Sequence, residues 1–133
     1  MKRMRAALFV FAVFSLVVGL RSEDEVSAQI HHQWRRGFIG KFTITPDQPI
    51  LDGWRLTVTF SKPIRRLEVW QATVVSKNKE KTEFVLENQK WNANLREGET
   101  YKFNFKGRKD GKGKEPSIDV SFESLHVGEG SGF

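Results

Sequence analysis

The residues with the clearest chemical potential in this 133-residue chain are four tryptophans, Trp34, Trp54, Trp70 and Trp91. From position 54 to position 60 apolar residues alternate strictly with polar ones, which is the period of a strand with one buried face. Trp54 is therefore expected in the core. Further along, Leu67 and Val69 hold the inward parity and turn Trp70 to the opposite side. Because an exposed indole leaves a large apolar surface in water, Trp70 is a candidate for ligand binding.

The other two tryptophans lie near polar segments. Trp91 stands in the run from Asn88 to Asn94 and is expected at the surface. Trp34 shares the parity of Ile30 but precedes a turn at positions 35–37, so the residues around it leave its placement open. Indoles stack on the apolar faces of pyranose rings, so three exposed tryptophans would suit a flat polysaccharide. Side-chain amides that can bond to sugar hydroxyls lie nearby: Gln33, Gln71, Asn88, Asn92 and Asn94.

Catalytic and metal-binding patterns are weak. His31 and His32 are adjacent on an expected strand, so their rings should point to opposite faces and cannot share a metal. No pair of carboxylates is singled out for glycoside hydrolysis. The sequence has no cysteine, no glycine-rich phosphate loop and no zinc-ligand spacing. We expect a protein that is not an enzyme and that uses no cofactor and no metal.

The N-terminus has the pattern of a secretory signal. A basic segment from Met1 to Arg5 precedes an apolar run from Ala6 to Leu20, too short for a stable membrane span. We expect residues 1–22 to be removed, with cleavage between positions 19 and 28. Cleavage after Ala28 would remove half of the first expected strand, which favours the earlier positions. The protein is then extracellular, with no membrane association after processing.

The mildly basic charge allows a secondary attraction to an anionic surface but does not define the function. The whole chain has a formal net charge of +6, and removal of Lys2, Arg3, Arg5 and Arg21 leaves 18 basic and 16 acidic residues, a net of +2. Nucleic acid is therefore not an expected partner. The segment from Lys106 to Lys114 has glycines at 107, 111 and 113 and is expected to be a solvated, flexible loop. A contact with acidic polysaccharide is the alternative for this segment.

The periodicity after Leu20 is that of strands throughout. Alternating runs begin near Val26, Phe38, Trp54, Ile64, Phe84, Tyr101 and Ile118, separated by turn residues. This pattern predicts an all-β fold, an antiparallel β-sandwich of two sheets with immunoglobulin-like layering. It has no disulfide, because the chain has no cysteine. We expect one domain over residues 23–127, a C-terminal tail over 128–133, and a monomer.

Several blocks of the sequence resemble the family 2 carbohydrate-binding modules. They are Gln33-Trp34-x-x-Gly37-Phe38, Phe42-Thr43-Ile44-Thr45, Asp52-Gly53-Trp54-x-Leu56-x-Val58-x-Phe60, Val69-Trp70-x-x-Thr73-Val74, Asn88-x-x-Trp91-Asn92-x-x-Leu95-x-x-Gly98 and Phe103-x-Phe105-x-Gly107. The blocks keep the order of the family and extend from Val26 to about Leu125.

The resemblance implies that Trp34, Trp70 and Trp91 form a flat binding strip and that Trp54 is the core tryptophan. It also implies a role for Gly37, since in this family a glycine here lets the first ring lie flat for cellulose, whereas an arginine raises it for xylan. The terminal disulfide of bacterial members is absent. The chain resembles the free-standing cellulose-binding proteins that some plant parasites secrete.

The resemblance thus favours non-catalytic binding of cellulose, as crystalline material or long chains. Gln33, Asn88 and Asn92 are the expected polar contributors. An alternative is a secreted protein-interaction module that docks on the plant cell wall. It would engage a wall enzyme, or an acidic polysaccharide such as pectin, through a basic face opposite the tryptophans.

Overall fold

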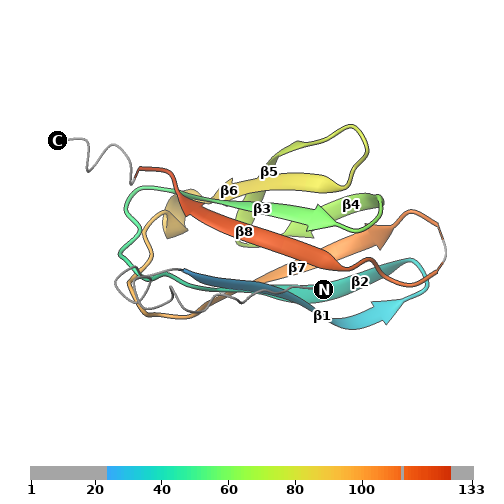
Figure 1. The fold of residues 1–133 in the computed structure, drawn as a ribbon, viewed down its shortest axis with the longest axis horizontal. Helices are drawn as coiled ribbons and strands as arrows, with labels where there is room; N and C mark the ends of the chain where they lie inside the picture. Colours follow the sequence, from blue (N-terminus) through green and yellow to red (C-terminus); the bar gives the residue numbers. More distant parts are fainter. Residues whose placement is uncertain (1–23, 112, 127–133) are drawn as a thin grey trace, which may run out of the picture.

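The strands form two stacked layers. A computed structural model describes residues 24–111 and 113–126; the expected signal segment and the tail at 128–133 lie outside the described residues. Figure 1 shows the two sheets facing each other. The elements are β1 (Glu25–Trp34), β2 (Gly37–Thr45), β3 (Trp54–Phe60), β4 (Ile64–Val69), β5 (Ala72–Lys77), β6 (Glu83–Asn88), a short 3₁₀ helix η1 (Lys90–Asn92), β7 (Tyr101–Lys109) and β8 (Ile118–Ser124).

Each sheet has four antiparallel strands. One has the order β1-β2-β7-β4 and the other β5-β6-β3-β8, and neighbouring strands pair in antiparallel fashion. Alternate residues of the strands point between the layers, so one continuous apolar core fills the sandwich. The predicted all-β sandwich without disulfides is confirmed. Within the described residues, no helix is long and apolar enough to cross a membrane.

Trp54 is the largest side chain that is fully buried in this core. It is fully buried at the start of β3, and its ring stacks on Phe103 with centroids 5.1 Å apart and planes at 11°. The ring of Phe122 from β8 lies 6.1 Å away. Strands of both sheets therefore converge on this indole, and its predicted burial is confirmed.

A β-bulge changes the expected placement of the two adjacent histidines. The register of β1 against β2 shifts between Ile30 and His32, so that His32 pairs with the outward residue Ile39. His31 lines an outer hollow together with Trp70. A bulge inserts one residue against the partner strand and allows two successive side chains to reach one face. The prediction that the two rings lie on opposite faces is wrong.

The basic segment that begins at Lys106 is also different from the expectation. Its first part, through Lys109, is the end of β7 and pairs with both β2 and β4. Gly107 does not interrupt the strand, because it accommodates Phe38: a Cβ atom there would overlap the phenyl ring. The prediction of a loop from Lys106 onward is therefore wrong for residues 106–109, which belong to β7.

Candidate functional site

Three tryptophans remain exposed on the folded sandwich. Trp34 at the end of β1 is 39% exposed, Trp70 between β4 and β5 is 58% exposed, and Trp91 in η1 is 72% exposed. They are three of the five large exposed apolar residues of the described chain, together with Leu51 and Val75. A stable domain that leaves three indoles in water has surface suited to a flat apolar ligand.

Strand register places Trp34 and Trp70 on the outer face of one sheet. Trp34 pairs with Gly37, which in turn pairs with Arg108 of β7. The Trp70 amide donates a 3.2 Å hydrogen bond to the main-chain oxygen of Asn104, also on β7. Four residues along β7 at ~3.3 Å each and three strand spacings of ~4.8 Å separate the two tryptophans by about 20 Å. A ligand that contacts both must be an extended chain of several sugar units.

Gly37 lies directly against the ring of Trp34. An added Cβ atom at Gly37 would lie 2.9 Å from Cζ2 and 3.0 Å from Cε2 of the indole, and 2.7 Å from the main-chain oxygen of Gly107. The ring of His32 lies on another side, with its centroid 5.8 Å from that of Trp34. The indole can take this position only because residue 37 has no side chain.

Trp70 borders a hollow on the same face. The hollow has a volume of about 320 Å³ and is lined by His31, Ile39, Gly40, Trp70, Gln71, Asn104 and Phe105. The side-chain oxygen of Gln71 accepts a 2.9 Å hydrogen bond from the amide of Asn104. This bond extends the β4–β7 ladder by one step after β4 has ended, and it fixes the turn that carries Trp70.

Trp91 is held in place through its neighbour Asn92. Asn92 is 7% exposed. Its Oδ1 accepts a 2.8 Å hydrogen bond from the main-chain amide of Gln89, and its Nδ2 donates a 2.8 Å hydrogen bond to the main-chain oxygen of Gln71. The main-chain oxygen of Asn92 accepts a 2.7 Å bond from Nε1 of Trp54. The loop with Trp91 is thus tied both to the core and to the turn that carries Trp70.

The polar residues that the sequence suggested as sugar-binding groups have partners within the fold. Oδ1 of Asn88 accepts a hydrogen bond from the main-chain amide of Trp54, and Nδ2 of Asn88 donates one to the main-chain oxygen of Gln89. Gln33 accepts a 3.1 Å bond from Nζ of Lys109. Asn92 is buried, as described above. Asn88 and Asn92 therefore help to position η1, a role that their residue type alone does not indicate.

Other residues also lie on this face. The sequence does not single out Ile39 and Asn104, and it places Lys106 and Arg108 in an expected loop. The signal for the β7 residues was present, since Asn104, Lys106 and Arg108 alternate with the inward positions 103, 105 and 107. The glycines at 107, 111 and 113 obscure this alternation, because they are typical of a loop.

The two outer faces of the sandwich carry opposite charge. The face with Trp34 and Trp70 is mainly basic: besides the acidic Glu25 and Glu68, it presents these basic residues from β2, β7 and β4: Lys41, Lys102, Lys106, Arg108 and Arg66. The opposite face presents Glu83, Glu87, Asp119 and Glu123 around a single arginine, Arg55. The expectation of a basic face opposite the tryptophans is therefore wrong, because β7 pairs between β2 and β4 and contributes its lysines to the tryptophan face.

Arg55 ties the acidic face together. Its guanidinium contacts Glu87 at 2.8 Å and Glu123 at 3.3 Å. The side-chain hydrogen bond to Glu87, together with the charges of both carboxylates, raises the pKa of Arg55 above its ordinary value. Nowhere in residues 24–111 and 113–126 do three or more histidine, cysteine or acidic side chains gather as a potential metal site.

A β-sandwich that displays tryptophans along one sheet has the form of a non-catalytic carbohydrate-binding module, and the family comparison gives the same class. The profile of the cellulose binding domain family matches residues 24–122, so the chain belongs to that family. This is the family 2 group of carbohydrate-binding modules that the sequence blocks resemble. No curated protein matches the chain.

Two solved structures share the fold. One is chitinase ChiA74 from Bacillus thuringiensis, 19% identical with a TM-score of 0.54, over 72% of this chain and 15% of the chitinase. The other is the chitin-binding domain of Chi18aC from Streptomyces coelicolor, 22% identical with a TM-score of 0.51, over 72% of this chain and 90% of that domain. The chain thus spans a small part of the chitinase, and likeness at these identities concerns the fold alone.

Proposed function

We propose that this chain binds cellulose, without cleaving it, through Trp34, Trp70 and Trp91. The proposal rests on the family to which the chain belongs and, above all, on one observation. Three indoles are exposed on the sandwich, and the segment that carries each has its own contact: Gly37 lies against the ring of Trp34, the Gln71–Asn104 bond holds the turn next to Trp70, and the buried Asn92 holds the loop next to Trp91.

The physical basis is stacking of indoles on the flat faces of linked pyranose rings. Each ring buried against a sugar contributes on the order of 1 to 2 kcal/mol, at ~25 cal/mol per Å² of apolar area. After the entropic cost of association, three such contacts correspond to a dissociation constant on the order of micromolar. A tryptophan side chain has only two rotatable bonds, so it loses little rotamer freedom when it stacks on a sugar.

The spacing of the tryptophans favours a long, extended ligand. Trp34 and Trp70 lie at opposite edges of a four-stranded sheet, so one short oligosaccharide cannot cover both. The surface of a crystalline cellulose fibril presents many parallel chains at once and can meet all three rings. We include secretion in the proposal, since a polysaccharide of the plant cell wall lies outside the cell and residues 1–22 have the pattern of an export signal.

Chitin is the second candidate, because a structural neighbour is a chitin-binding domain. It is also an extended, insoluble polysaccharide with flat sugar faces. Direct comparison separates the two ligands: the purified protein is mixed with microcrystalline cellulose, chitin or insoluble xylan, and the protein left in solution is measured over a concentration series.

Retention on cellulose with weaker retention on xylan is the expected result. The Val75→Ala variant is a matched control, since it removes an exposed apolar side chain of β5, in the other sheet. It should bind as the wild type does. Tighter binding to chitin than to cellulose would assign the second ligand, and a protein that remains in solution with all three would refute carbohydrate binding by this face.

A further inference from the structure

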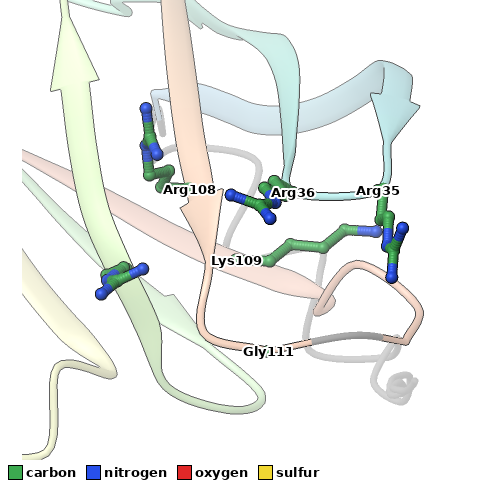
Figure 2. A pocket seen from close by; sticks show the side chains of 6 residues that line it. Arg35, Arg36, Arg108, Lys109 and Gly111 are labelled. Carbon is green, nitrogen blue, oxygen red and sulfur yellow. The ribbon is translucent and has the colours of Figure 1, made fainter.

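A cluster of cations lies at one end of the sandwich, beside Trp34. Arg35 and Arg36 come from the β1–β2 turn, Arg65 from the start of β4, and Arg108 and Lys109 from the end of β7. With Gly111 they line a pocket of about 270 Å³ (Figure 2). Five positive groups from three separate segments thus share one small cavity.

Lys109 is a built part of this pocket. Lys109 is only 9% exposed, although its side chain is charged. Nζ donates a 2.8 Å bond to the oxygen of Gly113 and a 3.1 Å bond to Oε1 of Gln33. Figure 2 shows its side chain extending from the end of β7 toward the turn with Arg35 and Arg36. The Lys109 amide also donates to the oxygen of Arg36, so the turn and the strand end are fixed together.

The cluster has no acidic partner in the described part of the chain. The ion pairs of the described residues involve Arg55, Arg66 and His126 with their acidic partners, and none involves a residue of the pocket. Asp110, the next residue after Lys109, makes no such pair. Like charges gathered without counterions repel one another, so a bound anion would stabilise the arrangement. Arginine presents its donors as a planar fork that matches a carboxylate.

The pocket is continuous with the surface around Trp34. A second hollow, of about 480 Å³, is lined by Trp34, Arg35, Arg36, Lys106 and Arg108. Three arginines therefore line both cavities: Arg35, Arg36 and Arg108. A sugar ring that stacks on Trp34 would have its edge directed at these guanidinium groups. In a uronic acid, the carboxylate is attached at the ring edge.

We propose that Trp34 and this cationic cluster form a second binding site, for uronate units of an acidic polysaccharide. The indole takes the face of the sugar ring and the arginines take its carboxylate. The site shares Trp34 with the proposed cellulose-binding tryptophans. It does not require Trp91, and its ligand is charged rather than neutral. Trp34 next to the cluster favours a sugar over an acidic peptide, because a peptide carboxylate does not bring a flat ring with it.

The probe is polygalacturonate, with the same polymer methyl-esterified as its uncharged match, measured by titration calorimetry with the full chain. Polygalacturonate should bind, and esterification should weaken binding on the order of tenfold or more, since charge-assisted bonds are lost. The variant Arg36→Gln/Arg65→Gln should lose affinity by a similar factor. The control Arg96→Gln/Lys102→Gln removes the same charge at the other end of β7 and should bind as wild type does.

Two further variants separate this site from general charge attraction. Trp34→Ala should weaken polygalacturonate binding, and Trp91→Ala should leave it unchanged. The proposal is overturned if polygalacturonate does not bind or if the two charge-removing pairs lose affinity equally. It is also overturned if poly-glutamate binds as tightly and Trp34→Ala has no effect, which would assign an acidic protein surface as the partner.

Cellulose binding is measured on the same proteins. Arg36→Gln/Arg65→Gln should still bind cellulose. If the wild type binds polygalacturonate but not cellulose, the uronate site stands and the proposed function fails.

Discussion

Nε1 of the buried Trp54 donates a 2.7 Å hydrogen bond to the main-chain oxygen of Asn92, the residue after the most exposed tryptophan, Trp91. This hydrogen bond joins a core side chain to the loop that carries Trp91. Asn92 also donates a hydrogen bond to the main-chain oxygen of Gln71, next to Trp70, so the same bonded segment adjoins two of the three exposed tryptophans.

Trp54 and Trp70 should respond to truncation in opposite ways. Trp54→Ala removes a fully buried ring from a core without disulfides and should lower the free energy of unfolding by about 3 to 5 kcal/mol. Trp70→Ala should change it by less than about 0.5 kcal/mol and should weaken cellulose binding. Urea denaturation and a cellulose depletion assay measure the two effects. If Trp70→Ala lowered the free energy of unfolding more than Trp54→Ala, the assignment of the buried and exposed faces would be wrong.

Asn92 should affect binding through position alone. Asn92→Ala removes the bonds to the amide of Gln89 and the oxygen of Gln71 and leaves both groups without that partner, which should cost about 1 to 3 kcal/mol. Cellulose affinity should fall with it, because η1 no longer fixes Trp91. Lys90→Ala, an exposed change in the same short helix, is the control and should alter neither property. Unchanged affinity in a destabilised Asn92→Ala protein would separate the loop from the site.

Gly37→Ala should weaken cellulose binding by displacing the ring of Trp34. A methyl group at this position lies within 3.0 Å of two indole atoms. A double-mutant cycle with Trp34→Ala tests the cause: in the Trp34→Ala background, the glycine change should have little further effect on affinity. Additive losses would indicate that the substitution acts through the nearby Gly107 oxygen and the backbone instead.

Cellulose binding should depend only weakly on salt. The ligand is neutral and the proposed contacts are ring on ring, so raising NaCl from about 0.05 M to about 1 M, where the Debye length is ~3 Å, should change affinity by less than about threefold. Depletion isotherms at the two salt concentrations measure this. A large loss at high salt would assign cellulose binding to the lysines and arginines of the same face.

Local alternation was sufficient to predict most of the fold. The strict period from Trp54 to Phe60 fixes which residues face the core, and the inward parity of Leu67 and Val69 predicts the exposure of Trp70. Trp34 was ambiguous from parity alone. A bulge between Ile30 and His32 shifts the register, and it moves His32 and Trp34 to the outer face. A bulge adds one residue without a characteristic composition, so the pattern carries no sign of it.

The charged surroundings of the site could not be predicted in the same way. Lys106 and Arg108 meet Trp34 because β7 pairs with β2, and that partner lies more than sixty positions away in the sequence. Gly107 suggested the end of a strand, yet its lack of a side chain makes room for Phe38. Pairing between distant strands decides which residues share a face, whereas local periodicity decides only which side of its own strand each residue occupies.

Binding of cellulose through the three exposed tryptophans is tested most simply with the triple variant Trp34→Ala/Trp70→Ala/Trp91→Ala. Its binding to microcrystalline cellulose is measured after circular dichroism and urea denaturation have verified its fold. We expect the wild type to be retained on cellulose and the folded triple variant to remain in solution. A folded triple variant that is retained as strongly as the wild type would contradict this expectation.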